Sequence, residues 1–230
     1  NAIVAEAFCE AADRLENAED LDMAVHDLIK EYMTAHQRII FNGDGYSDEW
    51  VKEAERRGLP NIRCMIDAAG TLTTEKSVRL FEKFGIFTKA ELISREEIIY
   101  ETYAKTLNIE ALTMINMANK KIIPAVIRYS KSLADTVIAV KDAGADASVQ
   151  RDILNTVSSK LITAKNALLR LEEATAQAGT IKSAKDKAFF YKDTVKVEMD
   201  ALRKPVDELE LVVDKSMWPM PTYGDLTFEV

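Results

Sequence analysis

The sequence predicts an all-α protein in which short helices precede a three-long-helix, up-down-up bundle and an extended C-terminal tail follows it. Three observations support this fold class. Apolar residues recur at helical spacing over most of the chain. Only 8 Gly and 5 Pro interrupt the 230 residues, a composition that favours helices. The long periodic segments are joined by short connections, which favour antiparallel neighbours.

The first third of the chain is predicted to hold short helices. Ser47 is a good N-cap, and Gly58 stops the helix that begins after it. Gly85 is placed to end another helix in the left-handed conformation that glycine accepts. Residues 59–73 are predicted to be irregular. The helices expected in this part cover residues 2–16, 22–36, 48–57 and 75–84.

Three long helices are expected to follow. Thr88 and Glu91 have the spacing of a capping box at the start of the first. Pro124 should kink this helix or lie at a break in it, Gly144 closes it, and Pro205 falls late in the third helix. The three helices are predicted over residues 89–141, from Asp146 or Ser148 to Gly179, and from Ser183 onward.

Charge and cysteine content limit the possible classes of function. The first 60 residues carry 14 acidic and 6 basic side chains, so the whole net charge of −8 lies there. This balance argues against a nucleic-acid partner. No apolar run is long enough to predict a membrane span, and no segment has the pattern of a signal peptide. Two lone cysteines, Cys9 and Cys64, favour a reducing, cytoplasmic compartment and are too few for a structural zinc site.

The stretch FNGDGYSDEW at residues 41–50 is the most unusual in the chain. Counted as a calcium loop from Asn42, it places Tyr46 and Ser47 where an oxygen ligand and a glycine are needed. Counted as a phosphate loop, it places Asp44 between the glycines, where its charge would repel phosphate. Neither type of site is therefore favoured.

A turn between two helices explains the same residues better. Gly43 and Gly45 permit positive φ angles, and Ser47 caps the next helix. Asp48 and Glu49 then occupy the first helical turn, where the helix dipole favours acidic residues. We therefore expect a structured turn between two helices.

Four segments resemble type III glutamine synthetases, the large oligomeric class of bacteria. FNGDGYSDEWVKEAERRGLPN is similar to a segment near the C-terminal end of that family, and NAIVAEAF to the helix that follows its catalytic barrel. YAKTLNIEALTMINMANKKIIPAV resembles the long helix of the family, and WPMPTYGDLTFEV its C-terminus. The four blocks stand in family order and span essentially the whole chain. The chain also starts at Asn1 inside a helical pattern, so we expect it to be part of a longer protein.

The resemblance implies a parent ligase of nitrogen metabolism that joins ammonia to glutamate. That reaction consumes ATP, passes through γ-glutamyl phosphate, and needs magnesium or manganese and cationic groups around the phosphoryl group. In the family these ligands lie in the catalytic barrel, before the position of Asn1, and none can be matched here. We therefore assign no catalytic, cofactor-binding or metal residue and expect the segment alone to be inactive. His36 is expected to be a core or helix-end histidine rather than a ligand.

The resemblance also suggests where the chain divides into domains and which partners it contacts. Residues 1–73, with the turn at 41–47, would come from the end of the catalytic domain, 74–217 would form the bundle domain, and 218–230 the extended tail. The expected partners are the chain's own catalytic domain and neighbouring subunits of a homo-oligomer. The residues that are candidates for loop or subunit contacts are Asn42, Asp44, Tyr46, Trp218, Tyr223 and Phe228.

The tail has an apolar pattern that a frayed terminus would lack. Leu226, Phe228 and Val230 alternate with two polar residues, as in a half-buried strand. The tail either packs on its own helices or docks on the catalytic body or a neighbouring subunit. The alternative for the whole chain is a free-standing helical interaction module without enzymatic activity. The coding sequence upstream of Asn1 distinguishes that alternative from the glutamine synthetase interpretation.

Overall fold

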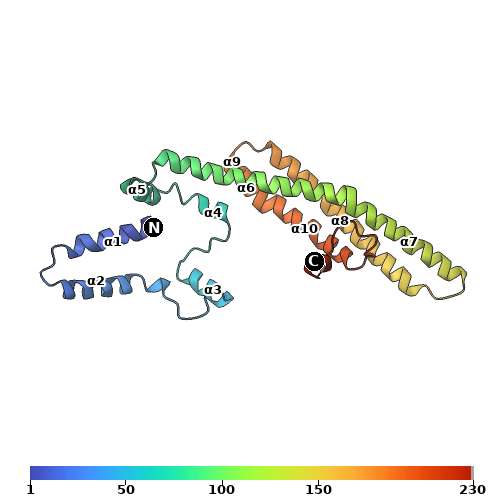
Figure 1. Cartoon of the computed structure of the whole chain (residues 1–230), viewed down its shortest axis with the longest axis horizontal. Coiled ribbons are helices and arrows are strands. Elements are labelled where there is room, and N and C mark those ends of the chain that lie inside the picture. Colours follow the sequence, from blue (N-terminus) through green and yellow to red (C-terminus); the bar gives the residue numbers. More distant parts are fainter. Residues whose placement is uncertain (229–230) are drawn as a thin grey trace. The chain divides into compact units, whose positions relative to one another are not determined.

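The computed structural model describes residues 1–228, which form helices and connecting segments (Figure 1). These residues include no β-strand, so the predicted all-α class is confirmed. The chain divides into two compact units, Asn1–Ile99 and Tyr100–Val230. None of the helices described here combines the length and the apolar character needed to cross a membrane.

The first unit contains the short helices, and all four that were predicted are confirmed. They are α1 (Ala2–Leu15), α2 (Leu21–Ala35), α3 (Asp48–Arg56) and α5 (Glu75–Lys83). The prediction of an irregular segment over 59–73 is wrong for α4 (Met65–Ala69). Ile66 and Ala69 of α4 are buried, so packing stabilises a helix that is too short to show a periodic pattern.

The predicted helix ends are confirmed around residues 85–91. Gly85 has a φ of 62°, and the next residue, Ile86, donates its N–H to the carbonyl of Phe81 at 2.9 Å. This bond is typical of a Schellman motif, which only a residue at positive φ can complete without strain. The capping box also forms, because the Thr88 N–H donates to Glu91 Oε2 at 2.8 Å and the Glu91 N–H donates to Thr88 Oγ1 at 3.3 Å.

The second unit is built on the three long helical segments, with the predicted up-down-up order. The first comprises α6 (Lys89–Met117, in this unit from Tyr100), a π turn (Ala118–Ile122) and α7 (Ile123–Asp142). The second is α8 (Ser148–Thr180). The third comprises α9 (Ala184–Phe190), a π turn (Tyr191–Val195) and α10 (Lys196–Glu210). Helix α8 packs against both α7 and α10, as Figure 1 shows.

The break predicted near Pro124 is confirmed as the π turn that immediately precedes α7. Proline has no N–H to donate to the preceding turn, and a π turn accommodates the missing bond. The second π turn was not predicted, and its residues contain no proline. Pro205 does not interrupt α10, which continues to Glu210.

The core of the bundle combines large and small apolar side chains. Several alanines of α6, the first π turn and α8 are almost completely buried, which lets the helices approach closely. The Tyr191 hydroxyl donates to Asn108 Oδ1 at 2.8 Å and so satisfies a polar group within this core. Burial raises the pKa of Tyr191. The large side chains that are completely buried are Val126, Val157, Leu168, Leu171, Val195, Leu202 and Leu209.

The tail differs from the prediction of an extended segment. Residues 218–222, which include both prolines, have no regular helix, but Tyr223–Phe228 form the short helix α11. The Thr222 N–H donates to Asp225 Oδ2 at 2.8 Å, and the Asp225 N–H donates to Thr222 Oγ1 at 3.2 Å. This reciprocal capping satisfies two donors that a helix start leaves free, and it overrides the alternating pattern. Glu229 and Val230, the last residues of the predicted strand, lie outside the described residues.

Candidate functional site

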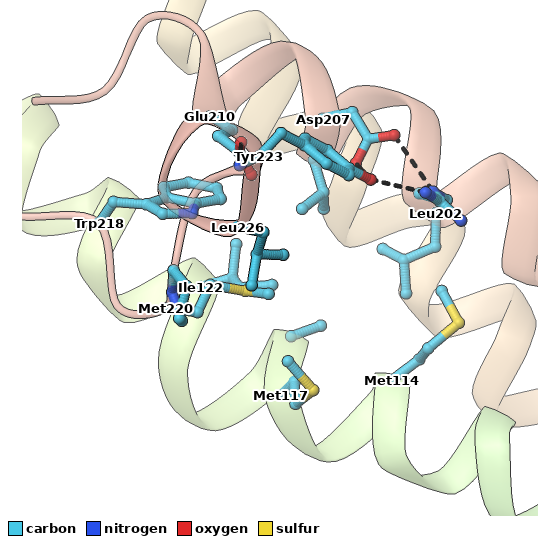
Figure 2. Close-up of a pocket in the computed structure, with 14 residues that line it drawn as sticks. Met114, Met117, Ile122, Leu202, Asp207, Glu210, Trp218, Met220, Tyr223 and Leu226 are labelled. Carbon is cyan, nitrogen blue, oxygen red and sulfur yellow. Dashed lines mark hydrogen bonds and ion pairs between the residues drawn. The ribbon is translucent and has the colours of Figure 1, made fainter. Parts of the chain in front are cut away.

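A cavity of about 330 Å³ lies in the second unit between α6 and its π turn, α10 and the tail (Figure 2). Its walls are mainly apolar. Helix α6 and the π turn form one wall, α10 a second, and the tail a third. The apolar residues that line the cavity are Met114, Met117, Ala118, Ile122, Leu202, Val206, Trp218, Met220, Pro221 and Leu226.

Polar residues form a connected group at the edge of the cavity. On α10, Arg203 and Asp207 are one turn apart, and Arg203 Nε lies 3.2 Å from Asp207 Oδ2. Arg203 Nη2 donates to the Tyr223 hydroxyl at 2.6 Å, and the hydroxyl donates in turn to Asp207 Oδ1 at 3.4 Å. The Tyr223 N–H donates to Glu210 Oε1 at 2.9 Å. These bonds join the start of α11 to α10 and raise the pKa of Arg203, mainly through its hydrogen bond to Tyr223.

Trp218 lies in the tail wall of the cavity and is only 7% exposed. Its backbone N–H is satisfied by the carbonyl of Asp214 at 3.0 Å. Its indole Nε1–H, by contrast, is shielded from water and has no hydrogen-bond partner among the described residues. A buried donor without an acceptor costs about 1–3 kcal/mol, so this group is a feature of the site that requires an explanation.

Further contacts hold the tail in its local conformation. Lys215 Nζ lies 2.5 Å from Asp225 Oδ1. The hydrogen bond from Lys215, followed by those from Thr222, lowers the pKa of Asp225 to about 2. Asp225 therefore has two roles. Its ion pair with Lys215 joins the two ends of the connecting segment, and its bonds with Thr222 cap α11.

The structure brings two of the predicted tail residues together. Trp218 and Tyr223 both line the cavity, whereas Phe228 is 83% exposed at the other end of α11 and does not line it. The residues of α6 and α10 that complete the cavity were not singled out from the sequence. One sequence signal could have indicated the polar edge of the cavity: Arg203 and Asp207 have opposite charges and lie one helical turn apart on α10.

The other predicted residues belong to the loop of the first unit. The Asp44 carboxylate accepts from the Tyr46 N–H at 2.9 Å, and the predicted N-cap Ser47 is confirmed by its bond from the Trp50 N–H at 3.2 Å. The Tyr46 side chain extends fully into solvent. The loop therefore has the hydrogen bonds of a turn, and Asn42 is exposed within it.

Aromatic stacking orders the same loop. The Phe41 and Trp50 rings stack with their centroids 4.3 Å apart, and the Arg57 guanidinium lies 5.6 Å from the centroid of Trp50. Gly43 and Gly45 permit positive φ angles, but neither adopts one in this loop. Gly43 instead lies against the Phe41 ring: a Cβ atom there would lie 2.5 Å from Phe41 Cζ, so the ring would have to shift.

The described residues contain no cluster of three or more His, Cys, Asp or Glu side chains that could hold a metal ion. His36 is the C-cap of α2, which confirms the helix-end role predicted for it. Its ring centroid lies 6.2 Å from that of Tyr32, on the preceding turn of the helix.

Comparison with known proteins identifies the family. The family model of the glutamine synthetase C-terminal domain matches residues 24–141. The chain belongs to this family. It is 36% identical over 216 residues to a glutamine synthetase of Butyrivibrio fibrisolvens, covering 93% of this chain and 31% of the relative. It is 31% identical over 214 residues to the type-3 glutamine synthetase of Dictyostelium discoideum, covering 89% of this chain and 29% of the relative.

A third relative extends the match over almost the entire chain. A glutamine synthetase of Bacteroides fragilis is 30% identical over 228 residues, which is 96% of this chain and 31% of the relative. The resemblance inferred from the four sequence blocks is thus confirmed. The chain spans about a third of the length of these curated glutamine synthetases.

Proposed function

We propose that this chain is the C-terminal helical region of an ATP-dependent glutamine synthetase, where it serves structure and assembly and supplies no catalytic residue. The parent enzyme would join ammonia to glutamate, with ATP and magnesium or manganese bound in its catalytic domain. The family match over residues 24–141 supports the parentage. The two free cysteines, Cys9 and Cys64, support a reducing, cytoplasmic compartment.

The observation that carries the assembly role is the apolar surface of the first two helices. Helix α1 has no buried residue, and its Val4 and Phe8, one turn apart, are 56% and 71% exposed. Helix α2 buries only Leu28 and leaves Ile29 and Met33, also one turn apart, more than half exposed. Large apolar residues grouped in this way are typical of a surface that another protein part covers.

The catalytic domain of the same enzyme is the partner we propose for this surface. Residues 1–73 would then be the segment that joins the catalytic domain, followed by the bundle at 74–217 and the tail at 218–230. The exposed Tyr46, together with Asn42 and Asp44, would contact a neighbouring subunit or the edge of the catalytic domain.

The exposed end of α11 supports a second contact. Leu226 is 73% exposed and Phe228 is 83% exposed, although both are large and apolar. Aromatic residues at such positions often dominate the affinity of a docking surface. We therefore assign this end of the tail to a neighbouring subunit of the homo-oligomer, while Tyr223 holds the start of α11 on α10.

The experiment uses a full-length glutamine synthetase that contains this region. Deleting residues 223–230 is expected to weaken the oligomer or lower turnover while the helix content falls by no more than the 6 residues of α11, because the bundle ends before the deletion. Sedimentation velocity, phosphate release and far-UV circular dichroism measure the three quantities. A truncated enzyme with its full oligomer and full turnover would contradict the assembly role of the tail.

The apolar surfaces would also suit a free-standing helical interaction module that binds a separate protein. The coding sequence upstream of Asn1 separates the two functions, because only the synthetase requires a catalytic domain in the same reading frame. A second test is catalytic. The isolated chain is expected to release no phosphate with glutamate, ammonia and ATP, and glutamate-dependent release by a clean preparation would show that it carries catalytic residues.

A further inference from the structure

We infer that the cavity between α6, α10 and the tail binds a small, uncharged and mainly apolar molecule that carries a hydrogen-bond acceptor, such as a carbonyl oxygen. The acceptor would face the indole N–H of Trp218. This inference concerns the 230-residue chain itself and does not depend on the activity of a parent enzyme.

The size and lining of the cavity indicate the apolar body of the ligand. Its volume of about 330 Å³ lies within the range of small-molecule sites, which starts at roughly 300 Å³. Met114, Met117 and Met220 contribute three flexible, polarizable side chains that can adjust to the shape of a ligand.

The hydrogen bonds around the cavity indicate the polar part of the ligand. Arg203, Asp207, Glu210 and Tyr223 are already bonded to one another at the edge. A charged ligand would have to compete with these bonds, whereas an uncharged one leaves them intact. The Trp218 Nε1–H, in contrast, has no partner among the described residues. A ligand acceptor would satisfy it.

The Trp218 N–H lies beside the cavity but does not open into it. Figure 2 shows the nitrogen-bearing edge of the Trp218 ring on the side of Met220 and Leu226, which line the same cavity. The N–H is shielded from water, so a neighbouring side chain must move when a ligand binds. Met220, which lies on this side of the ring, has an unbranched and flexible side chain that can move.

Ligand binding would also stabilise the position of the tail. Trp218, Met220 and Leu226 come from the tail, whereas Met114 and Leu202 come from helices of the bundle. A molecule that contacts both walls holds them together, because it binds the closed arrangement better than an open one.

The test observes the indole N–H directly. The chain has two tryptophans, so Trp50→Phe leaves Trp218 as the single source of an indole signal in a ¹H–¹⁵N spectrum. The probes are acetophenone, which has an apolar ring and a carbonyl acceptor, and α-methylstyrene, which has nearly the same shape and no such acceptor. Acetophenone is expected to shift the indole proton downfield in a saturable way. α-Methylstyrene is expected to bind about 2- to 10-fold more weakly and to produce no downfield shift, because a neutral hydrogen bond is lost.

A second variant tests the donor. In Trp218→Phe, ligand-detected NMR should show that acetophenone no longer binds more tightly than α-methylstyrene, because the hydrogen bond that favoured it has been removed. The ratio of the two affinities is measured on one preparation, so a general loss of affinity does not affect it. If this variant does not fold, the two-probe titration of Trp50→Phe decides alone. Absence of a saturable shift with acetophenone, or equal affinity for the two probes when Trp218 is present, would overturn the inference.

Discussion

Leu168 offers the sharpest test of how the bundle packs. Its side chain on α8 is fully buried in the core, whereas the next residue, Leu169, is 50% exposed. Replacing Leu168 by alanine removes three buried carbon atoms, which at about 0.8 kcal/mol each gives about 2.4 kcal/mol of lost transfer free energy. The cavity that remains adds to this cost, so we expect the free energy of unfolding to fall by about 3–5 kcal/mol.

Urea unfolding measures this change, and Leu169→Ala is the matched control. With Trp50→Phe as the background, Trp218 fluorescence follows the second unit, in which Trp218 is 7% exposed. At a typical slope of about 2 kcal/mol per molar urea, Leu168→Ala should lower the midpoint by about 1.5–2.5 M. Leu169→Ala should change the free energy of unfolding by about 0.5 kcal/mol or less. Similar midpoints for the two variants would refute the assigned orientation of α8.

Two further substitutions test local features. Asp225→Asn should loosen α11, and amide hydrogen exchange of the tail at pH 5 measures the effect. The folded pKa of Asp225 is about 2, below its usual 3.8, so its stabilisation is present above pH 4 and is lost as the pH falls through 2. Exchange at pH 5 equal to that of the unmodified chain would contradict this role. Gly43→Ala should displace the Phe41 ring from Trp50, because the new Cβ would lie 2.5 Å from Phe41 Cζ. Gly45→Ala, which has no atom within 4 Å, should leave the Trp50 indole resonance unchanged, and the same result for Gly43→Ala would be contrary evidence.

Local signals were sufficient to predict most of the helices. The bundle helices are long enough for an apolar stripe to repeat many times, and the first and third begin at recognisable caps, Thr88 and Ser183. Ser183, for example, accepts a hydrogen bond from the Asp186 N–H at 3.2 Å at the start of α9. Such signals lie within a few residues of one another, so the sequence displays them directly.

Short elements were harder to predict because two local signals can compete. In the tail, alternating apolar residues indicated a strand, while Thr222 and Asp225 had the spacing of a helix cap. The cap determines the conformation of α11, since its two bonds form without any distant partner. In α4, burial of Ile66 supplies a stabilisation that no local pattern reveals.

The cavity could not be predicted from the sequence. Trp218 and Tyr223 were selected for their aromatic character, but nothing near them indicates that they face Met114 and Met117 on α6. That relationship depends on the packing of segments about a hundred residues apart. Likewise, the sequence does not reveal that the Trp218 indole N–H lacks a hydrogen-bond partner among the described residues, because this depends on the positions of all neighbouring elements.

The central claim is that the apolar surface of the first helices is covered in a complete glutamine synthetase. Hydroxyl-radical oxidation, read by mass spectrometry, measures this for Phe8, which is 71% exposed in this chain. Tyr191, only 3% exposed, serves as the control for folding because it should be protected in every sample in which the bundle is intact. We predict that Phe8 is oxidised several times more slowly in the full-length enzyme than in the isolated chain. Equal rates of oxidation of Phe8 in the two samples would contradict the claim.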